Sequence, residues 1–279
     1  NAGTHIQVKL GDFADQYEIG TVTIDRIEGS GSTKNDRYFI GEGLDDKAIN
    51  LSTGAGDDNI VVLSGNSVTI NSGGGADRID VSAAVSGLID VTAGTENDDI
   101  RISTPEDETL VRYSASTLRG GGDDDYIVGS IGADMIFGGP GRDTIIALAG
   151  IDTIYGHDSA NGGDATDRDS IDAGEGADFV WAGGGDDKVR GGSGADEIHG
   201  GSGEDLLEGE SGPDRIYGDG DDDTLFGGQD GDFIYAGYGN DFINWSHGDG
   251  NDRIDGQGWS DKLLVVAETG LVVDAFRVS

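Results

Sequence analysis

The stretch GGSGADEIHGGSGEDLLEG, from Gly191 to Gly209, repeats a nine-residue pattern of glycines, one aspartate and one aliphatic residue. Across the whole chain, 52 of 279 residues are glycine, well above the usual share of about 7%. Glycine loses more backbone freedom on ordering than any other residue, so a segment of this kind folds only with an added source of stability.

The charge of the chain also indicates that folding needs an added source of stability. Its 55 acidic and 17 basic residues give a net charge of -38, so a compact state repels itself unless counter-charges are built in. This charge excludes nucleic acid as a partner, because phosphate binding needs the opposite sign. The aspartates recur at fixed spacing among Ile, Val and Leu and do not form a block, which indicates a structural role.

Other features of the sequence exclude further classes of protein. The absence of cysteine excludes disulfides and thiolate metal sites. No apolar run reaches the length of a membrane-spanning helix. His5, His157, His199 and His247 lie in no zinc-ligand spacing, and no G-x-S-x-G elbow occurs. We therefore expect a protein that is not an enzyme.

Internal repeats decide the predicted fold. From Gly120 the chain divides into fifteen units, each with Asp at position six and Ile, Val or Leu at position eight. One unit, Gly156–Asp172, is expanded, and Trp245–Ser246 is a short insert. Glycine at positions one, two and four allows a sharp turn, and the residues after the aspartate form a very short strand with one inward side chain. Two units then make one coil of an all-β parallel β-roll, a right-handed β-helix solenoid.

The core of such a solenoid is thin, because each repeat buries only one aliphatic side chain. A further ligand is needed to offset the entropy of ordering nine residues. Turns that offer only carboxylate and carbonyl oxygens suit a hard cation, and Ca²⁺ accepts this donor set better than Mg²⁺ or zinc.

The units GGPGRDTII (138–146), GGSGADEIH (191–199) and AGYGNDFIN (236–244) resemble the G-G-x-G-x-D-x-U-x repeat of the RTX, or haemolysin-type, calcium-binding family. The resemblance implies a β-roll in which each Ca²⁺ lies between stacked turns, held by backbone carbonyls and position-six aspartates. It also implies secretion from a Gram-negative bacterium through a type I channel, a secreted or cell-surface location, and folding where calcium is high.

The resemblance places the position-six aspartates in two racks, one on each side of the solenoid. The first rack is expected to hold Asp125, Asp143, Asp169, Asp187, Asp205, Asp223, Asp241 and Asp261. The second rack is expected to hold Asp134, Asp152, Asp178, Asp196, Asp214, Asp232 and Asp252. Glycine ligands, acting through their carbonyls, are expected at Gly138, Gly141, Gly174, Gly176, Gly183, Gly185, Gly192, Gly194, Gly201, Gly203, Gly237 and Gly239. About ten to fifteen calcium ions would then be bound.

Some turns depart from the repeat. Leu148 replaces the second glycine of its unit, and Asp123 and Asp230 replace the fourth. The expanded unit Gly156–Asp172 carries eight extra residues. We expect weak or missing calcium at these turns.

Residues 1–119 are less regular, but four pairs of apolar residues nine positions apart indicate the same coils. These pairs are Leu51 and Ile60, Ile70 and Ile79, Val91 and Ile100, and Leu118 and Ile127. Each coil before residue 120 has only one turn of the repeat type, so Asp58, Asp77 and Asp98 are expected to extend the first rack alone.

The predicted organisation has four parts. Residues 1–28 supply N-terminal cap strands, 29–119 irregular coils with calcium on one side, and 120–264 the regular β-roll. Residues 265–279 form a C-terminal cap with a hairpin about Glu268–Gly270 and a possible secretion signal.

Position nine of the second-rack units carries mostly aromatic residues, predicted to point outward from one sheet. These position-nine residues are Phe137, Tyr155, Trp181, His199, Tyr217, Tyr235 and Asp255. One interpretation is that stacked rings stabilise neighbouring strands. The other is a strip that contacts sugar rings or another domain of a larger protein.

Two functions follow from these observations. The first is a calcium-binding β-roll module of a secreted toxin, adhesin, surface-layer protein or hydrolase, which folds when it binds calcium. The second is a polysaccharide-binding or polysaccharide-modifying β-helix in residues 1–119, with cell-surface glycans as partners and the repeats as its export and folding module.

Overall fold

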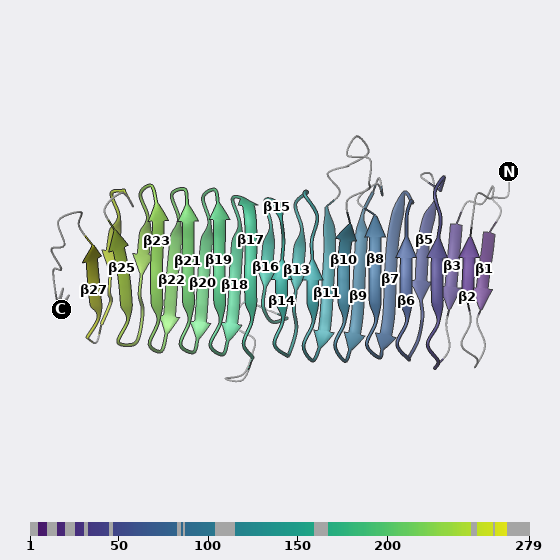
Figure 1. Cartoon of the computed structure of the whole chain (residues 1–279), viewed down its shortest axis with the longest axis horizontal. Coiled ribbons are helices and arrows are strands. Elements are labelled where there is room, and N and C mark those ends of the chain that lie inside the picture. Colours follow the sequence, from purple (N-terminus) through teal and green to yellow (C-terminus); the bar gives the residue numbers. More distant parts are fainter. Residues whose placement is uncertain are drawn as a thin grey trace. The chain divides into compact units, whose positions relative to one another are not determined.

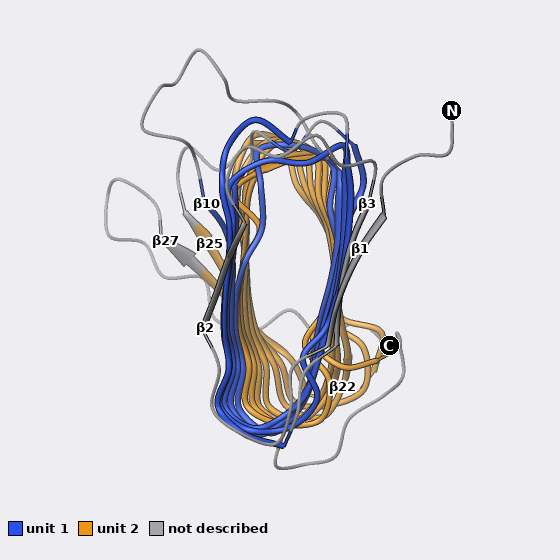
Figure 2. Cartoon of the chain, turned by 90° about the vertical axis from the view of Figure 1, so that its right-hand side faces the viewer, with its two compact units in different colours: residues 1–136 blue, residues 137–279 orange. Residues whose placement is uncertain are grey.

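A computed structural model describes residues 5–9, 16–19, 26–30, 33–44, 47–82, 85, 87–103, 115–158, 167–246, 250–258 and 260–266. These residues form strands joined by tight turns, and no helix occurs among them. The chain divides into two compact units, Asn1–Ile136 and Phe137–Ser279, coloured blue and orange in Figure 2. Each unit taken by itself is a parallel β-solenoid with two sheets, so the predicted all-β parallel β-roll is confirmed.

The strands of unit 1 alternate along the chain between two sheets (Figure 1). One sheet has the order β1 (His5–Lys9), β3 (Arg26–Ser30), β5 (Ala48–Ser52), β7 (Ser67–Gly74), β9 (Ile89–Thr95) and β11 (Ser116–Gly122). The other has the order β2 (Gln16–Ile19), β4 (Arg37–Ile40), β6 (Asn59–Val62), β8 (Arg78–Ser82), β10 (Asp99–Ser103) and β12 (Tyr126–Val128). The boundary between the units falls within β13 (Met135–Phe137).

Unit 2 repeats this arrangement with shorter connections. One sheet has the order β16 (Thr153–Tyr155), β18 (Phe179–Gly184), β20 (Glu197–Ser202), β22 (Arg215–Gly220), β24 (Phe233–Tyr235) and β26 (Arg253–Asp255). The other has the order β14 (Thr144–Ile146), β17 (Ser170–Gly176), β19 (Lys188–Ser193), β21 (Leu206–Ser211), β23 (Thr224–Gln229), β25 (Phe242–Ser246) and β27 (Lys262–Val266). A short strand, β15 (Ala149–Gly150), pairs with β17.

The register of the parallel strands stacks equivalent repeat positions on one another. Ile198 pairs with Ile216, and Ile216 pairs with Ile234. All four apolar pairs expected in unit 1 are buried. In unit 2, the buried position-eight residues are Ile145, Ile154, Ile171, Val180, Val189, Ile198, Leu207, Ile216, Leu225, Ile234 and Ile243. The core of unit 2 is therefore built mainly from one large aliphatic side chain per strand, whereas strands of unit 1 bury two, such as Ile60 and Val62 in β6.

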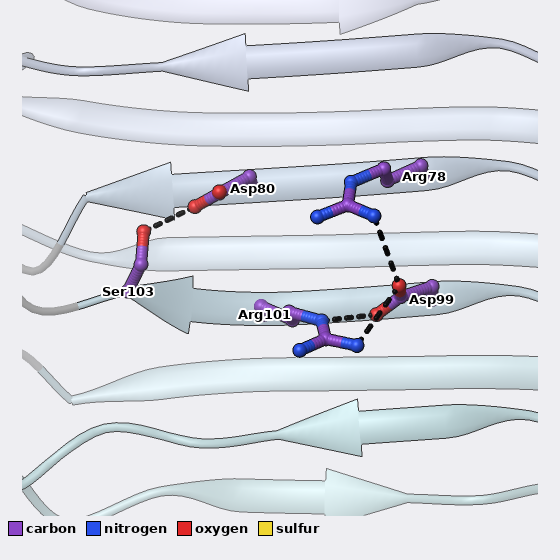
Figure 3. A network of polar contacts seen from close by, with 5 residues as sticks. All are labelled: Arg78, Asp80, Asp99, Arg101 and Ser103. Atoms are coloured by element: carbon purple, nitrogen blue, oxygen red, sulfur yellow. Dashed lines mark hydrogen bonds and ion pairs between the residues drawn. The ribbon is translucent and has the colours of Figure 1, made fainter.

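On the outer face of unit 1, acidic side chains of β8 and β10 have cationic or hydroxyl partners (Figure 3). The Arg101 guanidinium donates to both oxygens of Asp99 at 2.6 and 3.1 Å, and Arg78 Nη1 lies 3.7 Å from Asp99 Oδ2. The Ser103 hydroxyl donates to Asp80. These carboxylates are therefore stabilised within the sheet surface.

On the outer face of unit 2, the six aromatic members of the position-nine column form a continuous stack. Consecutive rings from Phe137 through Trp181 to Tyr235 have centroids 4.4–5.7 Å apart and interplanar angles of at most 10°. The rings of this column therefore stack on one another across neighbouring strands, as the first interpretation requires. Because the interior rings face one another, they present their edges to solvent, which is unfavourable for a sugar ring that stacks on an aromatic face.

We expect Trp181→Ala to lower the free energy of unfolding by about 1–3 kcal/mol, because it removes two ring pairs from the interior of the stack. Denaturant unfolding at saturating calcium measures this change. Tyr238→Ala is the control, since Tyr238 is 76% exposed and lies outside the stack. Equal stability of the two variants would contradict the role of the stack.

The predicted boundaries at residues 28, 119 and 264 stay predictions. β1 and β2, which fall in the predicted N-terminal cap, pair in parallel with β3 and β4. The hairpin about Glu268–Gly270 and the possible secretion signal lie outside the described residues. Within the described ranges, nothing helical has the length and apolar character needed to cross a bilayer.

Candidate metal centre

The turns depend on glycine at positions two and four, where the backbone has positive φ. Gly192 and Gly194 have φ of 104° and 141°, and an added Cβ would lie 2.0 Å from the Gly174 carbonyl oxygen and 1.4 Å from that of Gly176. Stacked turns therefore approach closely enough for backbone carbonyls of one coil to contact the next. Glycine is needed both for its conformation and for the absence of a side chain.

The departures from the repeat also have positive φ, which is strained for residues with a side chain. Leu148 has φ of 83°, Asp123 of 73° and Asp230 of 79°. These residues hold the same turn geometry as glycine, at a cost of roughly 1–2 kcal/mol each. The degenerate turns thus keep their shape in the fold.

Leu148→Gly is expected to raise the free energy of unfolding by about 1 kcal/mol, because it relieves the left-handed conformation of a branched residue. Calorimetry or denaturant unfolding at fixed calcium measures the gain. In the same turn, Ile151 is 61% exposed and does not have positive φ, so Ile151→Gly should give no gain. A loss of stability in Leu148→Gly would show that this turn does not need glycine.

The first-rack aspartates form a hydrogen-bonded ladder in each unit. In unit 1, the backbone N–H groups of Asp36, Asp58, Asp77 and Asp98 each donate to Oδ1 of the aspartate one coil later, at 2.7–2.8 Å, so that the bonds join Asp36 to Asp125 in order. In unit 2, the same bond joins Asp143, Asp169, Asp187, Asp205, Asp223 and Asp241 in order at 2.7–2.9 Å. A longer bond of 3.4 Å leads to Asp261.

The second-rack aspartates form an equivalent ladder in unit 2. The bonds join Asp152, Asp178, Asp196, Asp214, Asp232 and Asp252 in order, at 2.8–3.0 Å. Among the described residues of unit 1, Asp134 is the one predicted rack aspartate on this side, and it accepts from the Ser116 N–H group at 2.8 Å. The structure therefore brings the predicted aspartates together as two stacks in unit 2, and as one stack plus Asp134 in unit 1.

Each ladder bond uses one oxygen of the carboxylate and leaves the other inside the turn. In ten of the rack aspartates, this second oxygen, Oδ2, is buried and has no hydrogen-bond partner; they are Asp58, Asp77, Asp98, Asp178, Asp187, Asp196, Asp205, Asp214, Asp223 and Asp241. Their exposed fractions are 3% or less. A buried carboxylate oxygen without a partner is costly, so these oxygens indicate a missing ligand.

Backbone carbonyl oxygens converge on the same places. At Gly218, an added Cβ would lie 2.4 Å from Asp223 Oδ2 and 2.3 Å from the Ala236 carbonyl oxygen of the next coil. Gly209 is placed in the same way against Asp214 Oδ2 and the Gly227 carbonyl oxygen, at 2.4 and 2.5 Å. Glycine at position one thus leaves a carboxylate oxygen and a carbonyl oxygen facing one another across two coils.

Burial raises the pKa of these carboxyl groups, and neighbouring carboxylates raise it further. The pKa of Asp98 and of Asp214 rises to about 8, and that of Asp223 to about 9. Ladder hydrogen bonds from the backbone lower the pKa but do not offset the burial. The charged state of the racks therefore needs a positive charge nearby.

The donor set fits a hard divalent cation. Among the described residues, no group of three or more acidic or histidine side chains is arranged to hold a metal ion by itself, so backbone oxygens would have to contribute. Carboxylate oxygens with backbone carbonyls are the donors that Ca²⁺ accepts in adaptable geometry. The turns have no sulfur ligand to favour a softer metal.

Two unit 1 turns contain a feature that the repeat pattern did not indicate. Position one holds Thr53 and Ser72 in place of glycine, and their hydroxyl groups donate to the carbonyl oxygens of Ser72 and Ala93 in the next coil. These hydroxyls also lower the pKa of Asp58 and of Asp77, although burial leaves both pKa values raised. Hydroxyl groups thus satisfy carbonyls that face the turn interior. In the sequence, this feature is visible as a Ser or Thr five residues before the rack aspartate.

Asp134 differs from the other rack aspartates because serines satisfy both of its oxygens. Oδ2 accepts from the Ser130 N–H group at 2.6 Å, and Oδ1 accepts from the Ser116 and Ser130 hydroxyls at 2.8 and 3.0 Å. Ser130 stands at position two, where most units have glycine. This carboxylate is therefore partnered without a cation.

A parallel β-solenoid with stacked turns of buried carboxylate and carbonyl oxygens defines a calcium-binding β-roll. The family model of the RTX calcium-binding nonapeptide repeat describes four copies of the repeat. It matches the chain at residues 115–145, 137–168, 165–198, 199–234 and 217–244. Residues 115–244 therefore contain RTX calcium-binding nonapeptide repeats. No curated protein matches the chain.

Proposed function

We propose that the chain is a calcium-dependent folding module of a secreted bacterial exoprotein, exported through a type I channel and folded outside the cell. The buried Oδ2 oxygens without partners are the observation that carries this proposal. Bound calcium supplies the positive charge that lets these carboxylates stay ionised inside the turns. The proposal assigns the chain a binding and structural role and no catalytic step.

The chain's own residues explain why folding waits for the cation. With a net charge of -38, the ionised racks repel one another when the turns come together. In the regular repeats of unit 2, the core gains one large aliphatic side chain per repeat, which does not offset this repulsion together with the entropy of ordering a glycine-rich turn. A chain kept at low calcium would stay unfolded and competent for export, and would fold where calcium reaches about 10⁻⁴–10⁻³ M.

Which turns bind calcium follows from their donors. The rack aspartates of unit 2 whose Oδ2 has no partner are the strongest candidates, and Asp98 extends them in unit 1. Asp134 is the weakest candidate, because serine groups satisfy its carboxylate. Asp58 and Asp77 are weaker candidates for calcium binding than the unit 2 aspartates, because the Thr53 and Ser72 hydroxyl groups already interact with oxygens in these turns.

Far-UV circular dichroism of the calcium-stripped chain during a calcium titration tests the proposal, with magnesium as the control. We expect a disordered spectrum that changes cooperatively to β structure with calcium and not with magnesium. A chain that is fully β-structured without calcium would overturn the proposal.

A second candidate function is polysaccharide binding by unit 1. The register of β5, β7, β9 and β11 places Asn50, Thr69, Asp90 and Thr117 in one column of the outer face. Ser52, Asn71, Thr92 and Arg119 form the adjacent column. These hydrogen-bonding side chains suit a hydroxyl-rich ligand. A glycan array with the calcium-loaded chain tests this function, and Thr69→Leu should abolish any binding that depends on these columns.

A further inference from the structure

The expanded unit Gly156–Asp172 differs from the other turns of unit 2 at position four, where it has Asp167. Asp167 is equivalent to glycine in neighbouring coils, because its carbonyl oxygen would lie 1.6 Å from a Cβ at Gly185, as that of Gly176 lies against Gly194. Two other position-four acids in unit 2, Asp221 and Asp230, are exposed and have positive φ. Asp167, in contrast, is only 5% exposed. Its carboxylate therefore points into the turn stack.

The contacts of Asp167 place its carboxylate between coils. Oδ1 accepts the N–H group of Gly141, the position-four glycine of the preceding coil, at 2.6 Å. Oδ2 lies 3.9 Å from His157 Nε2. The next residue, Arg168, is turned away and pairs with Asp186 at 2.6 Å.

The following coil presents a second carboxylate to the same turn. Oδ1 of Asp187 accepts the Asp169 N–H group at 2.7 Å, and Oδ2 of Asp187 is buried without a partner. Burial raises the pKa of Asp187 to about 8, and the charge of Asp167 adds to this rise. At Gly156, moreover, Asp169 Oδ2 and the Ala182 carbonyl oxygen converge as in the regular turns, 2.4 and 2.2 Å from an added Cβ. The turn thus combines the usual donor set with an additional buried carboxylate.

We propose that Asp167 is an additional carboxylate ligand, so that the expanded unit holds a calcium ion more tightly than the regular turns. The inference rests on the proposed calcium function and reverses the expectation of weak calcium at this unit. The physical reason is that the number of charged ligands sets the affinity of a calcium site, and a buried carboxylate between coils adds one charge without a new turn.

The structure also offers another partner for Asp167, the His157 side chain, whose Nε2 lies 3.9 Å from Asp167 Oδ2. If that pair were the role of Asp167, the residue would stabilise the turn without altering calcium affinity. Variants at both positions separate the two roles.

The experiment measures calcium binding to the full chain by isothermal titration, with bound calcium counted after equilibrium dialysis. Asp167→Gly restores the residue that regular turns have, so the variant is expected to fold. Asp221→Gly is the matched control, because it makes the same replacement at an exposed position-four acid. Circular dichroism at saturating calcium verifies folding in each case.

We expect the affinity of the tightest site to fall by about tenfold or more in Asp167→Gly, and to stay unchanged in Asp221→Gly and His157→Gln. Identical isotherms for Asp167→Gly and the unchanged chain would overturn the inference. An equal loss in His157→Gln would overturn it too, since Asp167 would then act through its pair with His157. If the unchanged chain binds no calcium, the proposed function fails as well, which is a distinct result.

Discussion

Asp205→Asn is expected to raise the calcium concentration at the folding midpoint by about tenfold, because the loss of one rack charge weakens the sites on both sides of its turn. Asparagine keeps the Oδ1 acceptor for the Asp187 N–H group, whose bond is 2.9 Å, so the ladder remains while the charge is removed. Asp205→Ala removes the acceptor as well, and should cost about 1–3 kcal/mol more in stability at saturating calcium. Circular dichroism titrations followed by denaturant unfolding give both quantities.

The adjacent residue provides a control for this prediction. Glu204 is exposed, so Glu204→Gln removes the same charge from the same turn without altering the rack. Its calcium midpoint should stay close to that of the unchanged chain. If Glu204→Gln and Asp205→Asn shift the midpoint equally, net charge and not the buried carboxylate controls folding.

The calcium-free chain is expected to gain β structure as the pH falls from about 9 to about 5. Burial raises the pKa of Asp98 and Asp214 to about 8 and that of Asp223 to about 9, whereas the ordinary value is 3.8. At pH values between the ordinary pKa of 3.8 and these raised pKa values, the folded state binds more protons than the unfolded state. Stability of the calcium-free fold therefore rises as the pH falls through the raised pKa values, and is lost again as the pH rises through them.

The opposite trend is expected when calcium is present. Protons then compete with the cation for the same oxygens, so the calcium concentration at the folding midpoint should rise on acidification from pH 8 to about pH 6. Circular dichroism in chelator across this range, and calcium titrations at both pH values, measure the two trends.

High salt is the control for both pH trends, because it screens charge repulsion without protonating the racks. If salt at pH 9 induces as much β structure as acid does, general repulsion is the cause. A calcium-free chain that shows no response to pH would contradict the link between rack protonation and folding.

The periodic columns of the sequence were enough to predict the coils and the racks. The aliphatic residues at position eight predicted the core, because side chains at the same position of successive coils pack against one another across parallel strands. In unit 1, the spacing of Val91 and Ile100 identified a coil even though its connections vary in length. The racks followed in the same way from Asp at position six.

The partners of individual carboxylates were harder to predict, because they depend on contacts between coils. The pattern gave no indication that Oδ1 of one aspartate accepts the N–H group of another eighteen or more residues earlier. It also left unrecognised the serines around Asp134 and the hydroxyls of Thr53 and Ser72. These residues occupy repeat positions where glycine is usual, so their side chains appeared as defects and not as ligands. Asp167 was overlooked for the same reason.

The aspartate ladder has a direction. In every bond the donor belongs to the earlier coil and the acceptor to the later one, as from Asp187 to Asp205 and from Asp205 to Asp223. Removing coils from the C-terminal side of a unit therefore leaves the N–H group of the last remaining aspartate without its acceptor. Removing coils from the N-terminal side leaves only a carboxylate oxygen without its donor, and water solvates that oxygen readily. The two ends of a stack are thus not interchangeable, and growth of the fold from the C-terminal side gives each new turn a ready acceptor.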